Sequence, residues 1–354
     1  MSRIPVAVLG ATGTIGQRFV SLLQDHPAFE LALLSSSERK VGGRLGDFWR
    51  LEDVPLDPDV GRMELHPLDT KLLGTRGIVA AFSALPADVA GDFEEEAARA
   101  GVRVFSNASA HRMDVDVPLL VPEVNPDHLA LVERQATFKE GGFLTTNPNC
   151  SITGLVLALK PLADAFEFHA VHVSTYQALS GAGYPGVPSL DITANVVPFI
   201  ENEEEKMHRE AKKLLGTWSD GIVPSDLDVW ANCVRVAVRE GHLEAVSIPL
   251  EEDVDAGEVA KALTSFRGEP QRENLPTAPK DPILVRAERN RPQPLLDGMA
   301  GEPARARGMA VTVGRIRVTE CVLRFFVLSH NTLRGGAGGS VLNAEMASRR
   351  GYLG

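Results

Sequence analysis

A glycine-rich loop near the start of the chain constrains the fold more than any other feature of the sequence. The residues GATGTIG place Gly10, Gly13 and Gly16 three positions apart. They follow a short apolar run at 5–10, typical of a strand, and precede a segment with apolar residues at helical spacing. A strand, a glycine turn and a helix in this order indicate a loop whose backbone amides bind phosphate. The alternative is a glycine-rich turn that binds no ligand.

Strands and helices continue to alternate up to residue 149. Further apolar runs predict strands at 30–36, 78–85, 102–107 and 143–147, and helical patterns occur at 88–101 and 125–135. Strands that alternate with helices predict a doubly wound parallel sheet. We therefore expect an α/β chain whose first domain, residues 1–149, is a Rossmann-type dinucleotide-binding domain.

The pattern changes after residue 149. Residues 151–166 predict a buried helix, and longer strand-like runs follow at 170–179, 231–239, 243–250 and 312–328. Long strands with few helices between them indicate a mixed sheet. We expect a second, α+β domain over residues 150–331. The glycine-rich segment and helix at 332–354 are expected to return to the first domain.

Composition excludes several classes of protein. Of 354 residues, 36 are Lys or Arg and 47 are Asp or Glu, a net charge of −11. An acidic chain argues against nucleic acid as a partner, because phosphate backbones need a basic face. Cys150, Cys233 and Cys321 are widely spaced, which predicts neither disulfides nor a metal site. The short apolar run at the N-terminus and the lack of a membrane-length run predict a cytoplasmic protein without a membrane anchor.

The end of the second predicted strand indicates which dinucleotide is bound. An acidic residue there favours NAD, since it bonds the ribose hydroxyls. In this chain Ser35, Ser36 and Ser37 occupy that place, and Arg39 and Lys40 follow. Hydroxyls and cations suit a 2′-phosphate, so we expect NADP(H). The alternative is a solvated pair of surface charges.

Two residues predict thiol chemistry in the second half of the chain. Cys150 follows Asn-Pro-Asn at the start of the apolar helix, and a helix N-terminus stabilises a thiolate. His242 lies in a predicted turn between two strands, where an imidazole could serve that thiol. The alternatives are a small buried cysteine and a solvated histidine. Cys233 and Cys321 lie within strand patterns and are expected to be core residues.

Six motifs in order give the chain a family resemblance. They are GATGTIGQRF, SNAS (106–109), NPNCS (147–151), YQALSGAG (176–183), RVAVREGH (235–242) and NTLRGGAGGSVLNAE near the end. Together they resemble the aspartate-β-semialdehyde dehydrogenases of the archaeal and fungal-type branch, from residue 5 to about 350. The combination of NPNCS with R-x6-H is specific, whereas the glycine loop occurs in many enzymes. The terminal RGGAGG departs from the more usual RGAAG, and glycine keeps the backbone able to approach closely.

The resemblance assigns roles to individual residues. It implies that Cys150 is the nucleophile, Gln177 positions the substrate and His242 is the general acid/base. For the substrate it implies the following ligands: Arg235 for the α-carboxylate, Glu203 for the amine, and Arg112 and Lys206 for the phosphate. The acidic run ENEEEK, in which Glu203 and Lys206 lie, leaves their assignment open by one residue.

The glycine loop, the end of the second strand and the resemblance together predict the cofactor residues. They are Gly10, Thr12, Gly13, Thr14, Ile15, Ser35, Ser36, Arg39, Lys40, Ser83, Asn107, Ser180, Gly181 and Asn331. No metal is expected. The resemblance also implies a homodimer or homotetramer, with residues 150–331 as the catalytic and dimerisation domain.

The activity implied is reversible NADPH-dependent reduction of L-β-aspartyl phosphate to aspartate semialdehyde and phosphate, through a thioester on Cys150. This reaction belongs to the aspartate pathway of lysine, threonine and methionine biosynthesis. The main alternative is a malonyl-CoA reductase on the same scaffold, which would have no use for a carboxylate that binds an amine. A third alternative is a nucleotide-binding subunit without catalytic activity.

Overall fold

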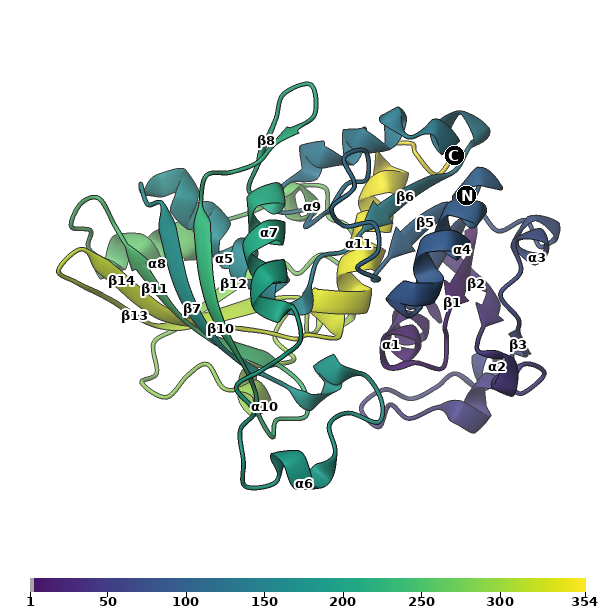
Figure 1. Ribbon diagram of the computed structural model, residues 1–354, viewed down its shortest axis with the longest axis horizontal. Helices are drawn as coiled ribbons and strands as arrows, with labels where there is room; N and C mark the ends of the chain where they lie inside the picture. Colours follow the sequence, from purple (N-terminus) through teal and green to yellow (C-terminus); the bar gives the residue numbers. More distant parts are fainter. Residues whose placement is uncertain (1–2) are drawn as a thin grey trace. The chain divides into compact units, whose positions relative to one another are not determined.

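The computed structural model describes residues 3–354, and within it the chain divides into two compact units (Figure 1). The first unit comprises the chain up to residue 120, residues 127–147 and residues 337–354. The second comprises residues 121–126 and 148–336. In the second unit, the short segment Val121–Pro126 is held by Glu123, whose buried carboxylate accepts hydrogen bonds from both terminal nitrogens of Arg334 at 2.8 and 2.6 Å.

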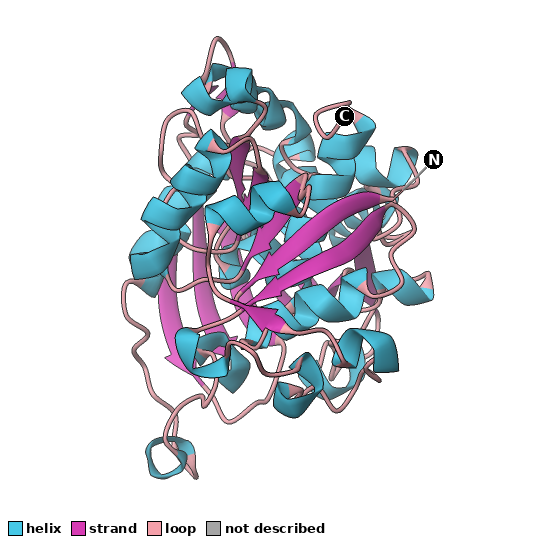
Figure 2. Cartoon of the chain, turned by 90° about the vertical axis from the view of Figure 1, so that its right-hand side faces the viewer, coloured by secondary structure: helices cyan, strands magenta, loops and turns pink. Residues whose placement is uncertain are grey.

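The first unit is built on a six-stranded parallel sheet, as the alternating pattern predicts. Its strand order is β3-β2-β1-β4-β5-β6, the order of the dinucleotide-binding doubly wound fold. Figure 2 shows these strands with helices on both sides. The strands are β1 Ile4–Leu9, β2 Phe29–Ser35, β3 Leu65–His66, β4 Ala80–Ser83, β5 Arg103–Ser106 and β6 Phe143–Thr146.

Side chains alternate between the two faces of this sheet, and each face is buried. One face carries an aromatic row from four strands, Phe29, Phe82, Phe105 and Phe143, in which adjacent rings lie 5.8–6.0 Å apart. The other face packs small and aliphatic residues against the helices. The helices are α1 Thr14–Leu23, α2 Pro58–Gly61, α3 Thr70–Thr75, α4 Ala87–Arg99 and α11 Gly338–Arg349. The C-terminal helix α11 packs against α1 and β5, all within this unit.

One local prediction in the first half needs correction, and two short elements were not predicted. Residues 125–135 do not form an α-helix; a 3-10 helix runs over Pro126–Arg134, with Leu129 and Val132, three residues apart, both buried. β3 and α3 were not predicted, because two and six residues are too short to show a periodic pattern.

The second unit is built on a mixed sheet, also as predicted, with the order β10-β7-β11-β14-β13-β12. β7 runs parallel to β10 and antiparallel to β11, and β12 runs parallel to β13. The strands are β7 Ala170–Gln177, β10 Asp228–Arg235, β11 His242–Pro249, β12 Ile283–Arg286, β13 Val311–Thr319 and β14 Val322–Ser329. A separate two-stranded ribbon pairs β8 Thr217–Trp218 with β9 Ile222–Val223.

Helices cover one face of this mixed sheet. α5 Cys150–Ala165 packs against β11, β13 and β14, α7 Glu203–Leu214 against β10, and α8 Ala256–Ser265 against β12 and β13. The remaining helices are short: α6 Ser189–Ile192, α9 Glu269–Arg272 and α10 Pro294–Asp297. On the other face of the sheet Tyr176 and Trp230 are 40% and 56% exposed, so in the single chain this face is open.

The predicted long strand 312–328 is instead a hairpin. β13 and β14 pair antiparallel, and the turn between them consists of Glu320 and Cys321, both with positive φ (52° and 57°). Two consecutive residues with positive φ form a two-residue turn whose twist matches the twist of the paired strands. No Asn or Gly marks this turn in the sequence, which is why the pattern reads as one strand. Cys321 therefore lies in a turn, not in the core. Cys233 is a buried strand residue, as expected.

Within residues 3–354, no helix combines the length and the apolar character that crossing a membrane would require.

Candidate active site

Cys150 is the first residue of α5, and its neighbours fix the start of that helix. Asn149 is the N-cap: its side-chain oxygen accepts from the amides of Ser151 and Ile152 at 2.9 and 3.3 Å. The amide of Asn149 donates to the buried carboxylate of Glu210 at 2.6 Å. The helix N-terminus is thus held from both sides, and the half-buried thiol lies where the helix dipole favours negative charge.

His242 lies beside this thiol, with Nε2 3.2 Å from Cys150 Sγ. It is the first residue of β11 and fully buried, whereas the sequence placed it in a turn; the turn ends at Gly241. The amide of Ala178 donates to its Nδ1 at 3.1 Å. Nδ1 is therefore an acceptor, and the proton of the neutral ring is on Nε2, facing sulfur. Burial and then the positive charge of Arg235 lower the pKa of His242 to about 3.

Two glycines allow the backbone to approach this pair closely. A Cβ on Gly335 would lie 2.7–2.9 Å from the backbone oxygen, Cα and Cβ of Cys150. A Cβ on Gly181 would lie 2.9 Å from Arg235 Nη1 and 3.2 Å from the His242 ring. Either side chain would displace the reactive groups. The contact with Gly335 was not predicted; the signal available was the unusual RGGAGG itself.

Gln177 and Glu203 meet next to the cysteine helix. Gln177 Nε2 donates to Glu203 Oε1 at 3.0 Å, and Ser151 Oγ donates to the same oxygen at 3.3 Å. Gln177 ends β7 directly opposite Arg235 at the end of β10. Arg235 Nη1 donates to the backbone carbonyl of Ala178 at 2.7 Å. The side chains of Gln177, Glu203, Ser151 and Arg235 are all polar and buried. The structure thus brings together five of the predicted residues: Cys150, Gln177, Glu203, Arg235 and His242.

The neighbouring acidic residues of α7 differ in their surroundings. Glu203 is buried at the first position of the helix, whereas Glu204 accepts from the amide of Cys233 at 3.0 Å and Glu205 is exposed. Of the three, Glu203 is the carboxylate bound to Gln177. Lys206 is half-buried one turn along from Glu203, which places the two on the same side of the helix.

Asn331 links two loops of the second unit. Its side-chain oxygen accepts from the amide of Gly241 at 2.9 Å, and its Nδ2 donates to Ser180 Oγ at 2.8 Å. The predicted cofactor residues Ser180 and Asn331 are therefore hydrogen-bonded to each other, and Gly181 follows directly. This arrangement also fixes the backbone just before His242.

The predicted phosphate loop lies between β1 and α1 of the first unit. Gly13 is the N-cap of α1 and no side chain caps it, so the amides of Thr14 and Ile15 begin the helix in an open first turn. Gly10 has φ +80°, and a Cβ on Gly16 would lie 2.0 Å from the Gly10 carbonyl oxygen. Only glycine at position 16 allows this close turn, the geometry in which a helix N-terminus accepts a pyrophosphate.

The end of β2 lies next to this loop. The Ser35 carbonyl accepts from the amides of Gly10 and Ala11 at 3.1 and 2.8 Å. Lys40 Nζ donates to Thr12 Oγ1 at 2.8 Å, so a cation from the predicted 2′-phosphate segment reaches the glycine loop. Burial and then the nearby Arg50 lower the pKa of Lys40. Ser36 is buried, whereas Arg39 is exposed.

The other predicted residues of the first unit lie at the carboxyl ends of its strands. Ser83 ends β4 and is buried. Asn107 follows β5; its Nδ2 donates to Ser340 Oγ of α11 at 2.9 Å, and its carbonyl accepts from Arg112 at 2.9 Å. The carboxyl edge of a parallel sheet is where such folds bind ligands.

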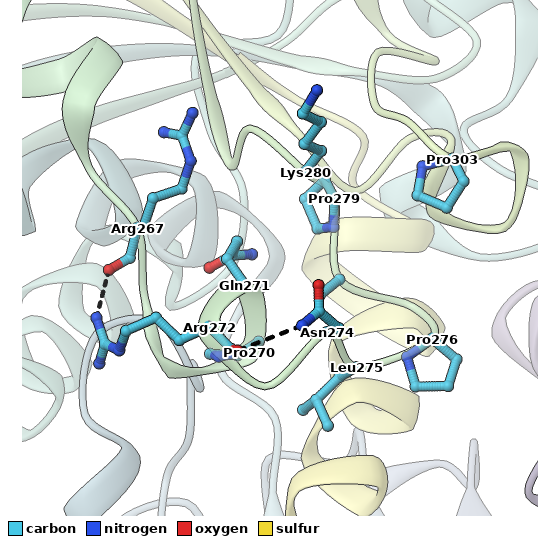
Figure 3. Close-up of a pocket in the computed structure, with 11 residues that line it drawn as sticks. Arg267, Pro270, Gln271, Arg272, Asn274, Leu275, Pro276, Pro279, Lys280 and Pro303 are labelled. Atoms are coloured by element: carbon cyan, nitrogen blue, oxygen red, sulfur yellow. Dashed lines mark hydrogen bonds between the residues drawn. The ribbon is translucent and has the colours of Figure 1, made fainter.

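A separate hollow of about 480 Å³ lies in the proline-rich part of the second unit. Figure 3 shows Arg272 donating to the carbonyl of Arg267 at its rim, with Lys280 and several prolines around it. None of the predicted catalytic or cofactor residues lines it.

Both units match models of one enzyme family. Residues 5–132 match the NAD-binding domain of semialdehyde dehydrogenases, and residues 159–334 match their dimerisation domain. The chain therefore belongs to the semialdehyde dehydrogenase family.

Relatives within this family indicate a more particular similarity. The chain is 48% identical to the aspartate-semialdehyde dehydrogenase of Methanothermobacter thermautotrophicus, over 97% of this chain and 98% of that protein. It is 38% identical to the malonyl CoA reductase (NADP) of Metallosphaera sedula, over 99% and 98%. A crystal structure of aspartate semialdehyde dehydrogenase with NADP from Candida albicans superposes with a TM-score of 0.87 at 37% identity, covering 99% of this chain and all of that one.

Proposed function

We propose that this protein is an NADP-dependent aspartate-semialdehyde dehydrogenase, which interconverts L-β-aspartyl phosphate and L-aspartate β-semialdehyde. The observation that carries the proposal is the thiol–imidazole pair of Cys150 and His242, 3.2 Å apart, beside the buried Gln177–Glu203 contact. A thiol activated next to buried polar side chains suits acyl transfer followed by reduction. The named relatives support the same assignment.

The first unit fits a dinucleotide. The uncapped first turn of α1 suits a pyrophosphate, Gly16 permits the close turn that precedes it, and Lys40 beside Thr12 supplies a cation for a 2′-phosphate. We assign the loop 10–16, Ser35, Ser36, Arg39 and Lys40 to this role, along with Ser83 and Asn107. Bound NADPH would supply the hydride for reduction.

The thiol chemistry follows from the geometry around Cys150. Its thiolate attacks the acyl phosphate carbonyl, the carbon–oxygen bond to phosphate breaks, and a thioester remains on Cys150. Reduction of that carbonyl by a hydride gives the oxyanion of a thiohemiacetal. The carbon–sulfur bond then breaks, so that the aldehyde leaves and the thiolate is restored. The amides at the start of α5 favour both the thiolate and the oxyanion that forms.

His242 contributes a proton donor at a fixed place. With Nδ1 accepting from Ala178, its Nε2–H points toward sulfur and so stabilises the thiolate before attack. The oxyanion on the carbon attached to sulfur forms within reach of the same proton. General acid/base action through an imidazolium would need a proton on Nδ1 and would cost the bond from Ala178.

We assign substrate recognition to four charged residues. Glu203 takes the α-amino group and Arg235 the α-carboxylate, a pairing that suits the planar guanidinium. Arg112 and Lys206 are assigned to the phosphate.

The second candidate is reduction of malonyl-CoA, favoured by the similarity to the Metallosphaera enzyme. Malonyl-CoA has no amine at the corresponding position. A buried carboxylate already oriented by Gln177 and Ser151 favours the aspartyl substrate instead.

We further propose that the protein acts as a homo-oligomer in the cytoplasm, at least a dimer. The match to a dimerisation domain supports this, and the open face of the mixed sheet is the proposed interface.

A spectrophotometric assay tests the proposed function. Enzyme, aspartate semialdehyde, phosphate and NADP⁺ should yield NADPH, and omission of phosphate should abolish most of the rate. NAD⁺ in place of NADP⁺ should react with a much higher KM. An absence of turnover, together with NADPH oxidation on adding malonyl-CoA, would replace the first proposal by the second candidate.

A further inference from the structure

Glu244 is a buried carboxyl group in the second unit that the proposed mechanism leaves without a role. Its side chain is 1% exposed, and neither of its carboxylate oxygens has a hydrogen-bond partner in the structure. Burying a carboxyl group without a hydrogen bond costs free energy, so the presence of Glu244 in this strand needs a physical reason.

Strand register places Glu244 directly beneath the catalytic groups. On β11 it lies two residues after His242, so both side chains point to the same face of the sheet. Across β7 it lies opposite Thr175, and across β10 Thr175 lies opposite Cys233. The row Glu244–Thr175–Cys233 therefore runs alongside the row His242–Gln177–Arg235, one pleat deeper in the sheet.

The two rows are connected through one amide. Gln177 Nε2 donates both to Glu203 Oε1 at 3.0 Å and to Thr175 Oγ1 at 3.3 Å. The hydroxyl of Thr175, which accepts from Gln177, has its own proton to give to a neighbour in the deeper row. Because Glu244 and Thr175 are direct cross-strand neighbours, a change at Glu244 acts on Thr175 through packing, then on Gln177, and then on the carboxylate assigned to the substrate amine.

We propose that Glu244 is a positioning residue of the amine pocket, which acts through Thr175 and Gln177 on Glu203 and thereby sets the preference for substrates that carry an α-amino group. This inference rests on the proposed function, since it takes Glu203 as the ligand of the amine. It assigns Glu244 no part in the thiol chemistry.

The charges around the group agree with this role. Burial, and then the negative charge of Glu203, raise the pKa of Glu244 well above its ordinary value. Glu203 and Glu204 face this region from α7, Cys233 and Arg235 from β10, and His242 lies on its own strand; the β14 neighbour opposite Glu244 is the apolar Val327. A neutral acid here adds no second anion beside Glu203.

The test compares two aldehydes that differ only in the amine. Aspartate semialdehyde carries it, and succinate semialdehyde lacks it. The quantity measured is the ratio of kcat/KM for the two aldehydes, in the phosphate-dependent direction with NADP⁺. Wild-type turnover of aspartate semialdehyde comes first, because its absence would refute the proposed function and not this inference.

Glu244→Met, an apolar change of similar size, should lower the ratio about 10-fold to 100-fold, the effect of displacing a substrate-binding group by about 1 Å. The loss should appear in the KM for aspartate semialdehyde and not in kcat. Glu244→Gln, which keeps a neutral polar side chain of nearly the same shape, should retain most of the wild-type ratio. The matched control is Val246→Ala, one pleat further along the same face of β11; it perturbs packing and should lower both rates alike.

Thr175→Val extends the test and replaces it where Glu244→Met does not fold. It removes only the hydroxyl, and it should lower the ratio as Glu244→Met does, with no further loss in the double variant. If Glu244→Met or Thr175→Val lowered kcat/KM equally for both aldehydes, the role of Glu244 would be structural only, and the inference would be overturned. An unaltered ratio, or a loss in Glu244→Gln as large as in Glu244→Met, would overturn it too.

Discussion

The imidazole of His242 carries its one proton on Nε2, because Nδ1 is occupied by the amide of Ala178. The ring is buried, and Arg235 is near enough to disfavour a second proton. This combination makes His242 a hydrogen-bond donor of fixed direction toward Cys150. It also couples one side chain to the stability of the whole second unit through pH.

That coupling has a definite sign. The pKa of His242 is lowered from 6.5 to about 3, so below pH 6.5 the unfolded chain takes up a proton that the folded chain does not. Stability should therefore fall as the pH drops from 6.5 toward 3, by about 1.4 kcal/mol per pH unit from this residue. Urea unfolding of wild type and His242→Gln at pH 7, 6 and 5 measures the difference. Parallel losses in both proteins would contradict the assignment.

Cys150 yields the most direct prediction at this scale. Cys150→Ala removes the nucleophile but leaves the Asn149 cap and the first unit intact, so turnover should fall about 10⁴-fold or more. NADP binding, measured by calorimetry, should match wild type. Turnover near the wild-type rate would exclude Cys150 as the nucleophile, whereas lost NADP binding would show that the substitution disturbs more than the thiol.

At the scale of elements, the junction of β1 and α1 depends on one missing side chain. Gly16 is buried in the first turn of α1, where a Cβ would lie 2.0 Å from the carbonyl oxygen of Gly10. The helix could accept that atom only by moving away from the loop, and the amides that accept pyrophosphate would move with it.

Gly16→Ala should therefore destabilise the protein by about 3 kcal/mol and abolish detectable NADP binding. Gly74→Ala is the matched control: this glycine lies in α3 of the same unit, and a Cβ there meets no atom within 4 Å. Gly74→Ala should raise the free energy of unfolding by about 0.5–1 kcal/mol, since alanine is the better helix residue. Thermal unfolding with and without NADP checks both. Similar behaviour of the two variants would mean that the loop tolerates displacement.

The elements also show what the sequence could and could not predict. Repeated apolar runs predicted five strands of the parallel sheet, and the Asn-Pro-Asn-Cys stretch predicted the helix start at Cys150. The hairpin turn at Glu320–Cys321 was missed, because positive φ there is imposed by pairing of the flanking strands and not by Asn or Gly. The local sequence pattern predicts which residues form strands, whereas the pairing of strands in the folded chain decides where a strand reverses.

The candidate site shows the same division. The two candidate reactive residues, Cys150 and His242, could be identified from the sequence with the help of the family resemblance. Their supporting groups could not: Glu210, Gly335 and Glu244 reach the site only through strand register and helix packing. Such residues lie far apart in the sequence and look like ordinary members of a helix, a loop and a strand.

For the whole molecule, the mixed sheet has one face covered by helices and one face open. Trp230 on β10 and Tyr176 on β7 project from the open face and remain 56% and 40% exposed in the single chain. Large aromatic side chains on an open sheet face are typical of the core of a protein interface. The match of residues 159–334 to a dimerisation domain agrees with a second copy as the partner.

Trp230→Glu should therefore shift the protein toward the monomer, because it replaces a large aromatic contact by a carboxylate that must lose its water on assembly. Light scattering coupled to size exclusion, at several protein concentrations, measures the shift; we expect the dissociation constant to rise about 100-fold or more. Leu295→Glu is the matched control: it makes the same change at a residue of α10 that is 92% exposed. If Leu295→Glu dissociates the protein and Trp230→Glu does not, the interface lies on another surface. If neither does, the open sheet face contributes little to assembly.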